Sequence, residues 1–178
     1  TYTYQLPGHG FKAVPSDSDL LAATLDELHH LIAPLKKVHL IGYSMGGRLA
    51  LHFKARFAHL VDKCVILSTH IGLIHEDEKE AKRAHDQHWT KLLNELSLST
   101  FVTKWYNMPL FGTPHLSESI KTVRTTHDKR DLITVFNALS TAHLPSLWDK
   151  PNDFFQNLLF FFGPDDTKKI AKGLRLSA

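Results

Sequence analysis

The sequence predicts an α/β fold built on a mostly parallel sheet with flanking helices and a helical insertion. Three observations predict it. Residues 1–70 alternate strand, helix, strand, helix and strand. A G-x-S-x-G motif at residues 42–46 lies between an apolar run and an amphipathic run. After a long helical stretch, residues 157–163 form a continuous apolar run, which is typical of a central strand in a parallel sheet.

The amino-terminal part supplies the first strand and the first helix. Residues 1–6 alternate apolar and polar side chains, which predicts a strand, and a Pro-Gly-His-Gly loop at residues 7–10 ends it. A helix is predicted from about Asp19 to Ala33, and Pro34 closes it. The predicted buried side of this helix consists of Leu21, Leu25, Leu28 and Ile32.

Two further strands flank a second helix. Residues 37–43 predict a buried strand, and residues 63–68 predict the third one. Between them, apolar side chains recur at four-residue spacing and mark one helix face: Leu49, Phe53 and Phe57. Strands that alternate with helices in this way are expected to pair in parallel.

A sharp turn is expected where the second strand meets this helix, at Gly42-Tyr43-Ser44-Met45-Gly46. A strand–turn–helix context is that of a nucleophile elbow, which lifts a serine hydroxyl clear of the sheet edge. We expect that positions 42 and 46 require glycine, because a Cβ at Gly42 or Gly46 would collide with the neighbouring strand or helix. Ser44 would then stand at a helix amino terminus, whose N–H groups stabilise developing negative charge. The alternative is a glycine-rich turn with an incidental serine.

The middle of the chain is helical. Residues 73–145 are predicted to form a helical cap or lid, with breaks near Pro109, residues 112–114 and Pro145. Ser117 with Glu118 opens one helix, and residues 128–139 form another. The expected domains are therefore a first core part at 1–72, the cap at 73–145, and a return strand and helix of the core at 146–178.

Composition excludes several function classes. The 178 residues carry a formal net charge of +3, with 43% hydrophobic and 22% charged residues and no basic stripe, so we expect no nucleic-acid partner. The apolar run at residues 158–162 is too short to span a membrane. Cys64 is the single cysteine and is expected to be buried, which fits a reducing cytoplasm. His85 and His88 have a metal-like spacing, but a solvated helix face is the favoured interpretation, and we expect no metal.

A serine nucleophile needs a base and an acid that orients the base. On this scaffold the chain order is serine, acid, histidine. Asp165 and Asp166 follow the last predicted strand, where catalytic groups gather, although a plain Pro-Asp-Asp turn explains them equally well. All 13 histidines precede Asp165, so none occupies the position expected for the base.

Three segments resemble a known family. They are Leu6-Pro7-Gly8-His9-Gly10, Gly42-Tyr43-Ser44-Met45-Gly46-Gly47-Arg48 and Trp105-Tyr106-Asn107-Met108-Pro109-Leu110-Phe111. The first segment and the elbow are shared by many α/β-hydrolases, whereas Arg48 and the W-Y-x-x-P-x-F segment narrow the match. Over nearly all of its length the chain resembles the 2-succinyl-6-hydroxy-2,4-cyclohexadiene-1-carboxylate synthases, which are α/β-hydrolase-fold lyases of menaquinone biosynthesis.

The resemblance implies an elimination and not a hydrolysis. Such enzymes release pyruvate from 2-succinyl-5-enolpyruvyl-6-hydroxy-3-cyclohexene-1-carboxylate and use a Ser–Asp–His triad without a cofactor. By position, Ser44 would be the catalytic serine, and Met45 would give a backbone N–H to the oxyanion hole. The family's acid is the fourth residue of its turn, which selects Asp166 over Asp165.

An acidic substrate requires cationic and hydrogen-bonding partners. By resemblance, Arg48 and Arg124 would bind its carboxylates. A further family arginine aligns with Lys82, beside Arg83, and either could serve, although lysine lacks the two-pronged contact. The aromatic residues that match pocket positions of the family are Tyr43, Trp105 and Tyr106. For Trp105 and Tyr106 the alternative is a plain core role.

The chain departs from the family at both ends. The family's His-Gly oxyanion loop and catalytic histidine would both lie outside residues 1–178, so we expect an internal fragment that is truncated at both ends. Such a fragment should have little or no activity, and its independent folding is doubtful. Two alternatives to the lyase stay open. One is an ester or thioester hydrolase of the same fold, and the other is a non-catalytic binding protein or remnant. The sequence leaves the oligomeric state open.

Overall fold

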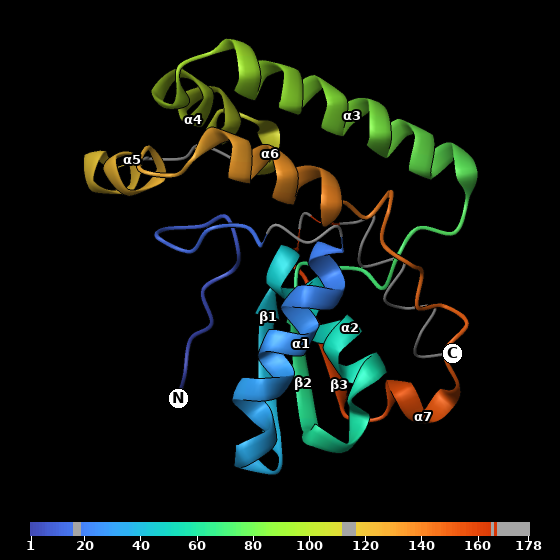
Figure 1. Cartoon of the computed structure of the whole chain (residues 1–178). Helices are drawn as coiled ribbons and strands as arrows, with labels where there is room; N and C mark the ends of the chain where they lie inside the picture. Colours follow the sequence, from blue (N-terminus) through green and yellow to red (C-terminus); the bar gives the residue numbers. More distant parts are fainter. Residues whose placement is uncertain (16–18, 112–116, 165, 167–178) are drawn as a thin grey trace. The chain divides into compact units, whose positions relative to one another are not determined.

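The computed structural model describes residues 1–15, 19–111, 117–164 and 166 (Figure 1). By their contacts the residues form two compact units. The helical unit comprises residues 1–20 and 77–143, and the sheet unit comprises residues 21–76 and 144–178. The predicted core and cap boundaries stay a prediction, since residues 1–20 group by contact with the helices.

The sheet unit contains a parallel sheet of three strands in the order β1–β2–β3. Strand β1 spans Val38–Tyr43, β2 spans Val61–Leu67 and β3 spans Leu158–Phe161. Tyr43 pairs with Leu67, which pairs with Phe161, so the three strands end at one edge of the sheet. The strands predicted around the serine motif and after the insertion are thereby present, but the predicted burial of the strand before Ser44 is wrong, because β1 is an edge strand of the described sheet.

Helices cover one face of this sheet. Helices α1 (Leu20–Ile32) and α2 (Met45–Arg56) lie on the same side of it (Figure 1), and the short helix α7 spans Asn152–Phe155. Short 3-10 turns follow α1 and α2, at Ala33–Leu35 and Ala58–Leu60. The predicted apolar sides of both helices are buried or partly buried. Leu49 is 2% exposed but lies outside the main core, in which the other predicted helix residues pack with alternate strand residues: Leu21, Leu25, Leu28, Ile32, Phe53, Phe57, Leu40, Cys64, Ile66, Leu158 and Phe160.

The opposite face carries exposed apolar side chains in the described part of the chain. Ile41 is 72% exposed and Tyr43 is 64% exposed, and on β3 Leu159 and Phe161 are 50% and 56% exposed. The prediction of a central strand at residues 157–163 is therefore wrong for the described sheet, in which β3 is an edge strand. A continuous apolar run is equally compatible with one covered face and one uncovered face.

The predicted first strand is also wrong, because residues 1–6 form no strand. A strand persists only where a neighbour satisfies its backbone groups, and the described sheet consists of β1, β2 and β3 alone. The side chains of this segment find other contacts. The Lys12 Nζ donates to the Tyr4 hydroxyl at 2.9 Å and lies 4.0 Å from the centre of that ring.

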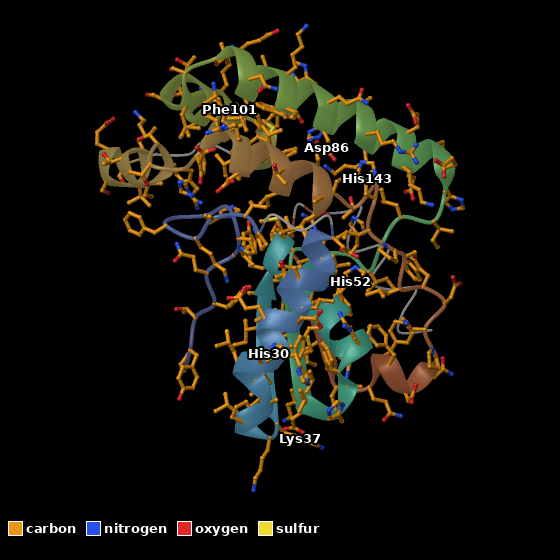
Figure 2. The ribbon with its side chains drawn as sticks, in the orientation of Figure 1. His30, Lys37, His52, Asp86, Phe101 and His143 are labelled. Carbon is orange, nitrogen blue, oxygen red and sulfur yellow. The ribbon has the colours of Figure 1, made fainter. Side chains whose placement is uncertain are left out.

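The helical unit contains α3 (Glu76–Glu95), α4 (Leu98–Tyr106), α5 (Glu118–Arg124) and α6 (Lys129–Ala138), with a 3-10 turn at Pro109–Phe111. The helices predicted to begin after Ser117 and Asp128 are confirmed, and both side chains accept backbone N–H groups as caps. Phe101 points into the packed side chains of this unit (Figure 2). The buried centre consists of Leu93, Phe101 and Val102.

The carboxyl-terminal helix expected from the sequence lies outside the described residues. It was predicted over residues 167–177, and Asp165 in the turn before it is likewise not described. Among the helices of the described residues, none combines the length and the apolar character that crossing a bilayer requires.

Candidate active site

Ser44 occupies a strained corner between β1 and α2. Its φ of 49° and ψ of −116° are rare for a residue with a side chain. The Ser44 N–H donates to the Leu67 carbonyl at 3.0 Å, and the Ser44 carbonyl accepts from the Arg48 N–H at 3.1 Å and from the Thr69 hydroxyl. These bonds hold the backbone on both sides of the corner. The geometry is that of a nucleophile elbow, as predicted.

The corner depends on two glycines, of which one was predicted. A Cβ on Gly42 would lie 2.6 Å from the Gly46 carbonyl oxygen and from the Gly47 Cα. A Cβ on Gly47 would lie 3.0 Å from the Gly42 oxygen and 3.1 Å from the side chain of Thr69. The expectation for Gly46 was wrong, because a Cβ there would meet no atom within 4 Å. Position 46 lies on the open side of the helix start, where space is not limiting.

The Ser44 side chain is exposed and is not used as a helix cap. The hydroxyl is therefore available to a ligand at the carboxyl edge of the sheet. Met45 is the first residue of α2, where a helix leaves N–H groups without intrahelical acceptors. The arrangement suits an oxyanion that forms beside Ser44, and the role of Met45 stays a prediction.

Asp166 follows β3 at the same edge of the sheet. Its N–H donates to the Gly163 carbonyl at 3.0 Å, and its side chain is half-buried. The Ser68 N–H donates to the Phe161 carbonyl at 2.8 Å, so the ends of β2 and β3 are tied together. Ser44 and Asp166 thus both emerge where the parallel strands end. A shared catalytic role stays a prediction.

Thr69 is a structural residue of the corner that the sequence did not single out. It is 4% exposed, and its hydroxyl contacts the Ser44 carbonyl. No sequence motif includes Thr69, because it lies 25 residues from Ser44 in the chain. The two residues come into contact only when β1 and β2 pair.

The buried face of α2 carries a neutral histidine near Arg48. His52 (Figure 2) is 9% exposed, and its pKa is lowered to about 4 by burial and, to a smaller extent, by the positive charges of Arg48 and Lys150. Arg48 is half-buried on the first turn of α2, and Tyr43 is exposed at the end of β1. Their predicted contacts with substrate stay predictions.

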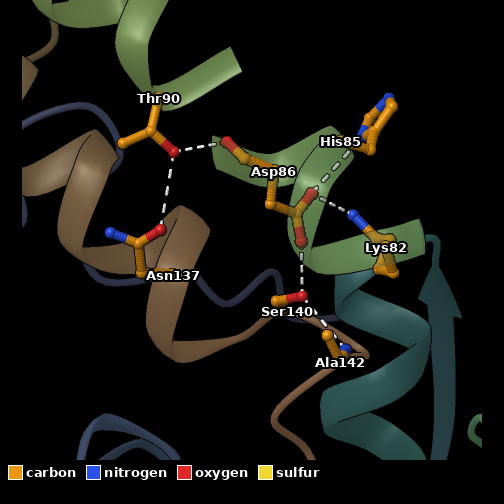
Figure 3. A network of polar contacts seen from close by, with 7 residues as sticks. All are labelled: Lys82, His85, Asp86, Thr90, Asn137, Ser140 and Ala142. Carbon is orange, nitrogen blue, oxygen red and sulfur yellow. Dashed lines mark hydrogen bonds and ion pairs between the residues drawn. The ribbon is translucent and has the colours of Figure 1, made fainter. Parts of the chain in front are cut away.

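Lys82 has a partner within the helical unit (Figure 3). Its ammonium group pairs with the carboxylate of Asp86, whose side chain is only 6% exposed. Asp86 also accepts the Ser140 hydroxyl at 2.5 Å, which ties α3 to the segment after α6. Arg83 pairs instead with the exposed Glu80 at 2.7 Å. Lys82 therefore has a structural task, and a substrate contact by Lys82 or Arg83 stays a prediction.

The two predicted pocket aromatics lie in different surroundings. Trp105 packs among aromatic rings, with its centre 4.9 Å from that of Trp89 and 5.4 Å from that of Phe136. These contacts fit the core role that the sequence left open as an alternative, but Trp105 is only half-buried, and its predicted contact with substrate stays a prediction. Tyr106 instead lines a pocket together with Arg124.

That pocket has a volume of about 590 Å³ and lies wholly within the helical unit. Its apolar lining side chains are Ile120 and Val123. Its polar side chains are Gln5, His9, Tyr106, Ser119, Arg124 and His127. The structure thus brings together two predicted substrate residues and adds His127 and Gln5, which sequence reasoning missed. In the part of the chain that the structure describes, no group of three or more metal-ligating side chains occurs.

Comparisons with known proteins agree with this geometry. The family model described as the alpha/beta hydrolase fold matches residues 1–135. The 2-succinyl-6-hydroxy-2,4-cyclohexadiene-1-carboxylate synthase of Citrobacter koseri is 30% identical over 180 residues, which cover 97% of this chain and 69% of that protein. The chain belongs to this synthase family. The resemblance carried by the three sequence segments is therefore confirmed.

Other members of the synthase family support the same conclusion. A putative synthase of this name from Bacillus subtilis is 31% identical over 173 residues, which cover 92% of this chain and 63% of that protein. The structure of MenH from S. aureus superposes with a TM-score of 0.83 at 25% identity, over 96% of this chain and 67% of that one. The chain thus spans about two thirds of the length of these relatives.

Proposed function

We propose that the chain belongs to a lyase of menaquinone biosynthesis that eliminates pyruvate from 2-succinyl-5-enolpyruvyl-6-hydroxy-3-cyclohexene-1-carboxylate. The observation that carries the proposal is the exposed Ser44 at a strained corner, in a chain of the synthase family. A hydroxyl held out of the sheet in this way is available to act on a bound ligand.

The proposed reaction gives each residue of the corner a separate role. Ser44, activated by a histidine, removes a proton from a ring carbon of the substrate. A ring double bond forms, the C–O bond to the enolpyruvyl group breaks, and the departing group takes up a proton to become pyruvate. The N–H of Met45 stabilises the enolate-like charge, and Asp166 orients the histidine.

The substrate is proposed to be held by its carboxylates. Arg124 and Tyr106 line one pocket, which supports their assignment to an acidic ligand. Arg48 on α2 is proposed to bind a second acidic group. Lys82 is the weaker candidate of the pair on α3, because its ammonium group already pairs with Asp86.

The test is an assay of pyruvate release by the full-length protein, with chromogenic ester hydrolysis as the competing readout. In the full-length protein, Ser44→Ala should lower pyruvate release by about a thousandfold or more. The matched control is Ser99→Ala on the exposed side of α4, which should leave the rate unchanged. Ester hydrolysis without pyruvate release would make the protein a hydrolase of the same fold. The absence of both activities would favour a binding protein.

A further inference from the structure

The pocket of the helical unit contains hydrogen-bond donors and no carboxylate. Its lining includes one guanidinium group, on Arg124, and two imidazoles, on His9 and His127. Acidic side chains are absent from the described lining, so nothing there neutralises the positive charge of Arg124. Ile120 and Val123 add apolar side chains to the lining. A lining that combines hydrogen-bond donors with aliphatic groups suits a small organic anion.

Two separate elements bring the imidazoles together. The ring centres of His9 and His127 lie 5.5 Å apart with planes at 85°, which is an edge-to-face contact. His9 belongs to the Pro-Gly-His-Gly loop, where its Nδ1 lies 3.0 Å from the Pro7 carbonyl oxygen. Because a carbonyl only accepts, this contact assigns the proton to Nδ1 and leaves Nε2 of a neutral His9 as an acceptor.

The loop is fixed against the helix that follows His127. Gly8 has a φ of +71°, and a Cβ there would lie 2.6 Å from the Val135 side chain on α6. The Val14 N–H donates to the Asp131 carboxylate, also on α6, at 3.2 Å. His127 itself lies between α5 and the Asp128 cap of α6. The loop that carries His9 is therefore held against α6, whose first turn follows His127 in the chain.

We propose that His127, held against His9, is the proton-dependent partner of Arg124 in a binding site for a small organic carboxylate. This deepens the proposed function and rests on it only for the expectation of an acidic ligand. The site itself is argued from the lining of one unit and makes no use of Ser44.

The charges that face His127 explain the proton dependence. Burial lowers the pKa of His127, and the nearby His9 and Arg124 lower it further, while the Val123 backbone carbonyl opposes them. Tyr106 shares the pocket lining. The neighbouring carboxylate of Asp128 is engaged by the N–H groups of Arg130 and Asp131, at 2.7 and 3.1 Å.

A bound carboxylate supplies the negative charge that this lining lacks. Binding then raises the pKa of His127, and a proton is taken up from solution with the ligand. The linkage has a definite sign: the affinity for the carboxylate should rise as the pH falls towards the pKa of His127, as long as the ligand stays ionised.

The experiment uses benzoate as the probe and benzamide as its uncharged match, with the full-length protein. Calorimetric titrations between pH 6 and 8, in buffers of different ionisation enthalpy, give both the affinity and the number of protons taken up. The variant is His127→Asn, and the matched control is His88→Asn, an exposed histidine of α3 that does not line the pocket. Circular dichroism checks that each variant folds.

We expect the affinity for benzoate to rise about tenfold from pH 8 to pH 6, with proton uptake. In His127→Asn the rise should shrink to about twofold or less, while His88→Asn should behave as the unaltered protein does. An unchanged pH dependence in His127→Asn would overturn the proposal, as would equal binding of benzamide. Equal binding of inorganic sulfate would also overturn it, because the site would then accept any anion.

A second measurement keeps the proposal testable if His127→Asn fails to fold. The NMR titration of the His127 ring in the unaltered protein should show a higher pKa with benzoate than without it. An unchanged titration would reject the role of His127. Pyruvate release is not needed for either readout, so a failure of this proposal is distinguishable from a failure of the proposed function.

Discussion

The corner at Ser44 and the network at Asp86 hold polar groups in place by different means. At the corner, backbone atoms approach so closely that a Cβ on Gly42 would lie 2.6 Å from two of them. At Asp86, side chains make the connection, since a buried carboxylate joins Lys82 to Ser140 across the helical unit (Figure 3). The first is a steric constraint and the second is electrostatic. They should therefore respond to different substitutions.

Removal of the buried carboxylate should have the largest effect of the three changes that test this comparison. Asp86→Ala should lower the free energy of unfolding by about 3 kcal/mol, because it leaves the Lys82 ammonium group and the Ser140 hydroxyl without their partner. Denaturant unfolding measures it. The control is Glu80→Ala, which removes the surface pair with Arg83 and should cost less than about 1 kcal/mol. Equal costs would mean that burial of Asp86 is unimportant.

The steric constraint at the corner should be visible in a pair of glycine substitutions. Gly42→Ala should cost about 2 kcal/mol, because the added methyl group meets backbone atoms that cannot move away without opening the turn. Gly46→Ala adds the same methyl group in open space at the start of α2, and should be neutral or slightly stabilising. The midpoints of denaturant unfolding compare the two. A loss of stability in both variants would show that the corner is not limited by contact.

The smallest effect on the free energy of unfolding is expected from the protonation of His52 in the sheet unit. His52 has its pKa lowered to about 4 in the folded state, against 6.5 in the unfolded chain. The unfolded state therefore binds the proton first as the pH falls, so this contribution is fully present above pH 7 and is lost towards pH 4. Between pH 7 and 5.5 it should amount to about 1 kcal/mol.

The His52 prediction is measured by unfolding at a series of pH values. His52→Gln should flatten this part of the profile, whereas His59→Gln, at an exposed position, should not. A profile that stays as steep in His52→Gln would assign the pH dependence to other groups.

The elbow could be predicted from the sequence because its signals are local. Motif, preceding strand and following helix occupy one short stretch, and the strained φ of Ser44 results from the turn that joins them. Gly46 shows the limit of that reasoning. The motif names a glycine at this position, but the atoms that exclude a Cβ at Gly42 and Gly47 are known only once β1 packs on α2.

Features that depend on distant partners could not be predicted. Residues 1–6 have the alternating pattern of a strand, but the described sheet offers them no strand with which to pair. For Trp105 the sequence left a pocket position and a core position open, and its packing among rings from its own helix, from α3 and α6, and from a 3-10 turn depends on residues far away in the chain. His127 was missed because its contact with His9 spans the chain, and no spacing rule connects two such residues.

The single thiol, on Cys64, can report on the opening of the sheet unit. Cys64 lies in the middle of β2 between Leu40 and Leu158, is 0% exposed, and has its pKa raised to about 11 by burial. A protonated and inaccessible sulfur does not react with alkylating reagents. The rate of alkylation therefore tracks the fraction of molecules whose sheet has opened. The 178 residues contain one cysteine, so the helices of the other unit can melt without adding to that signal.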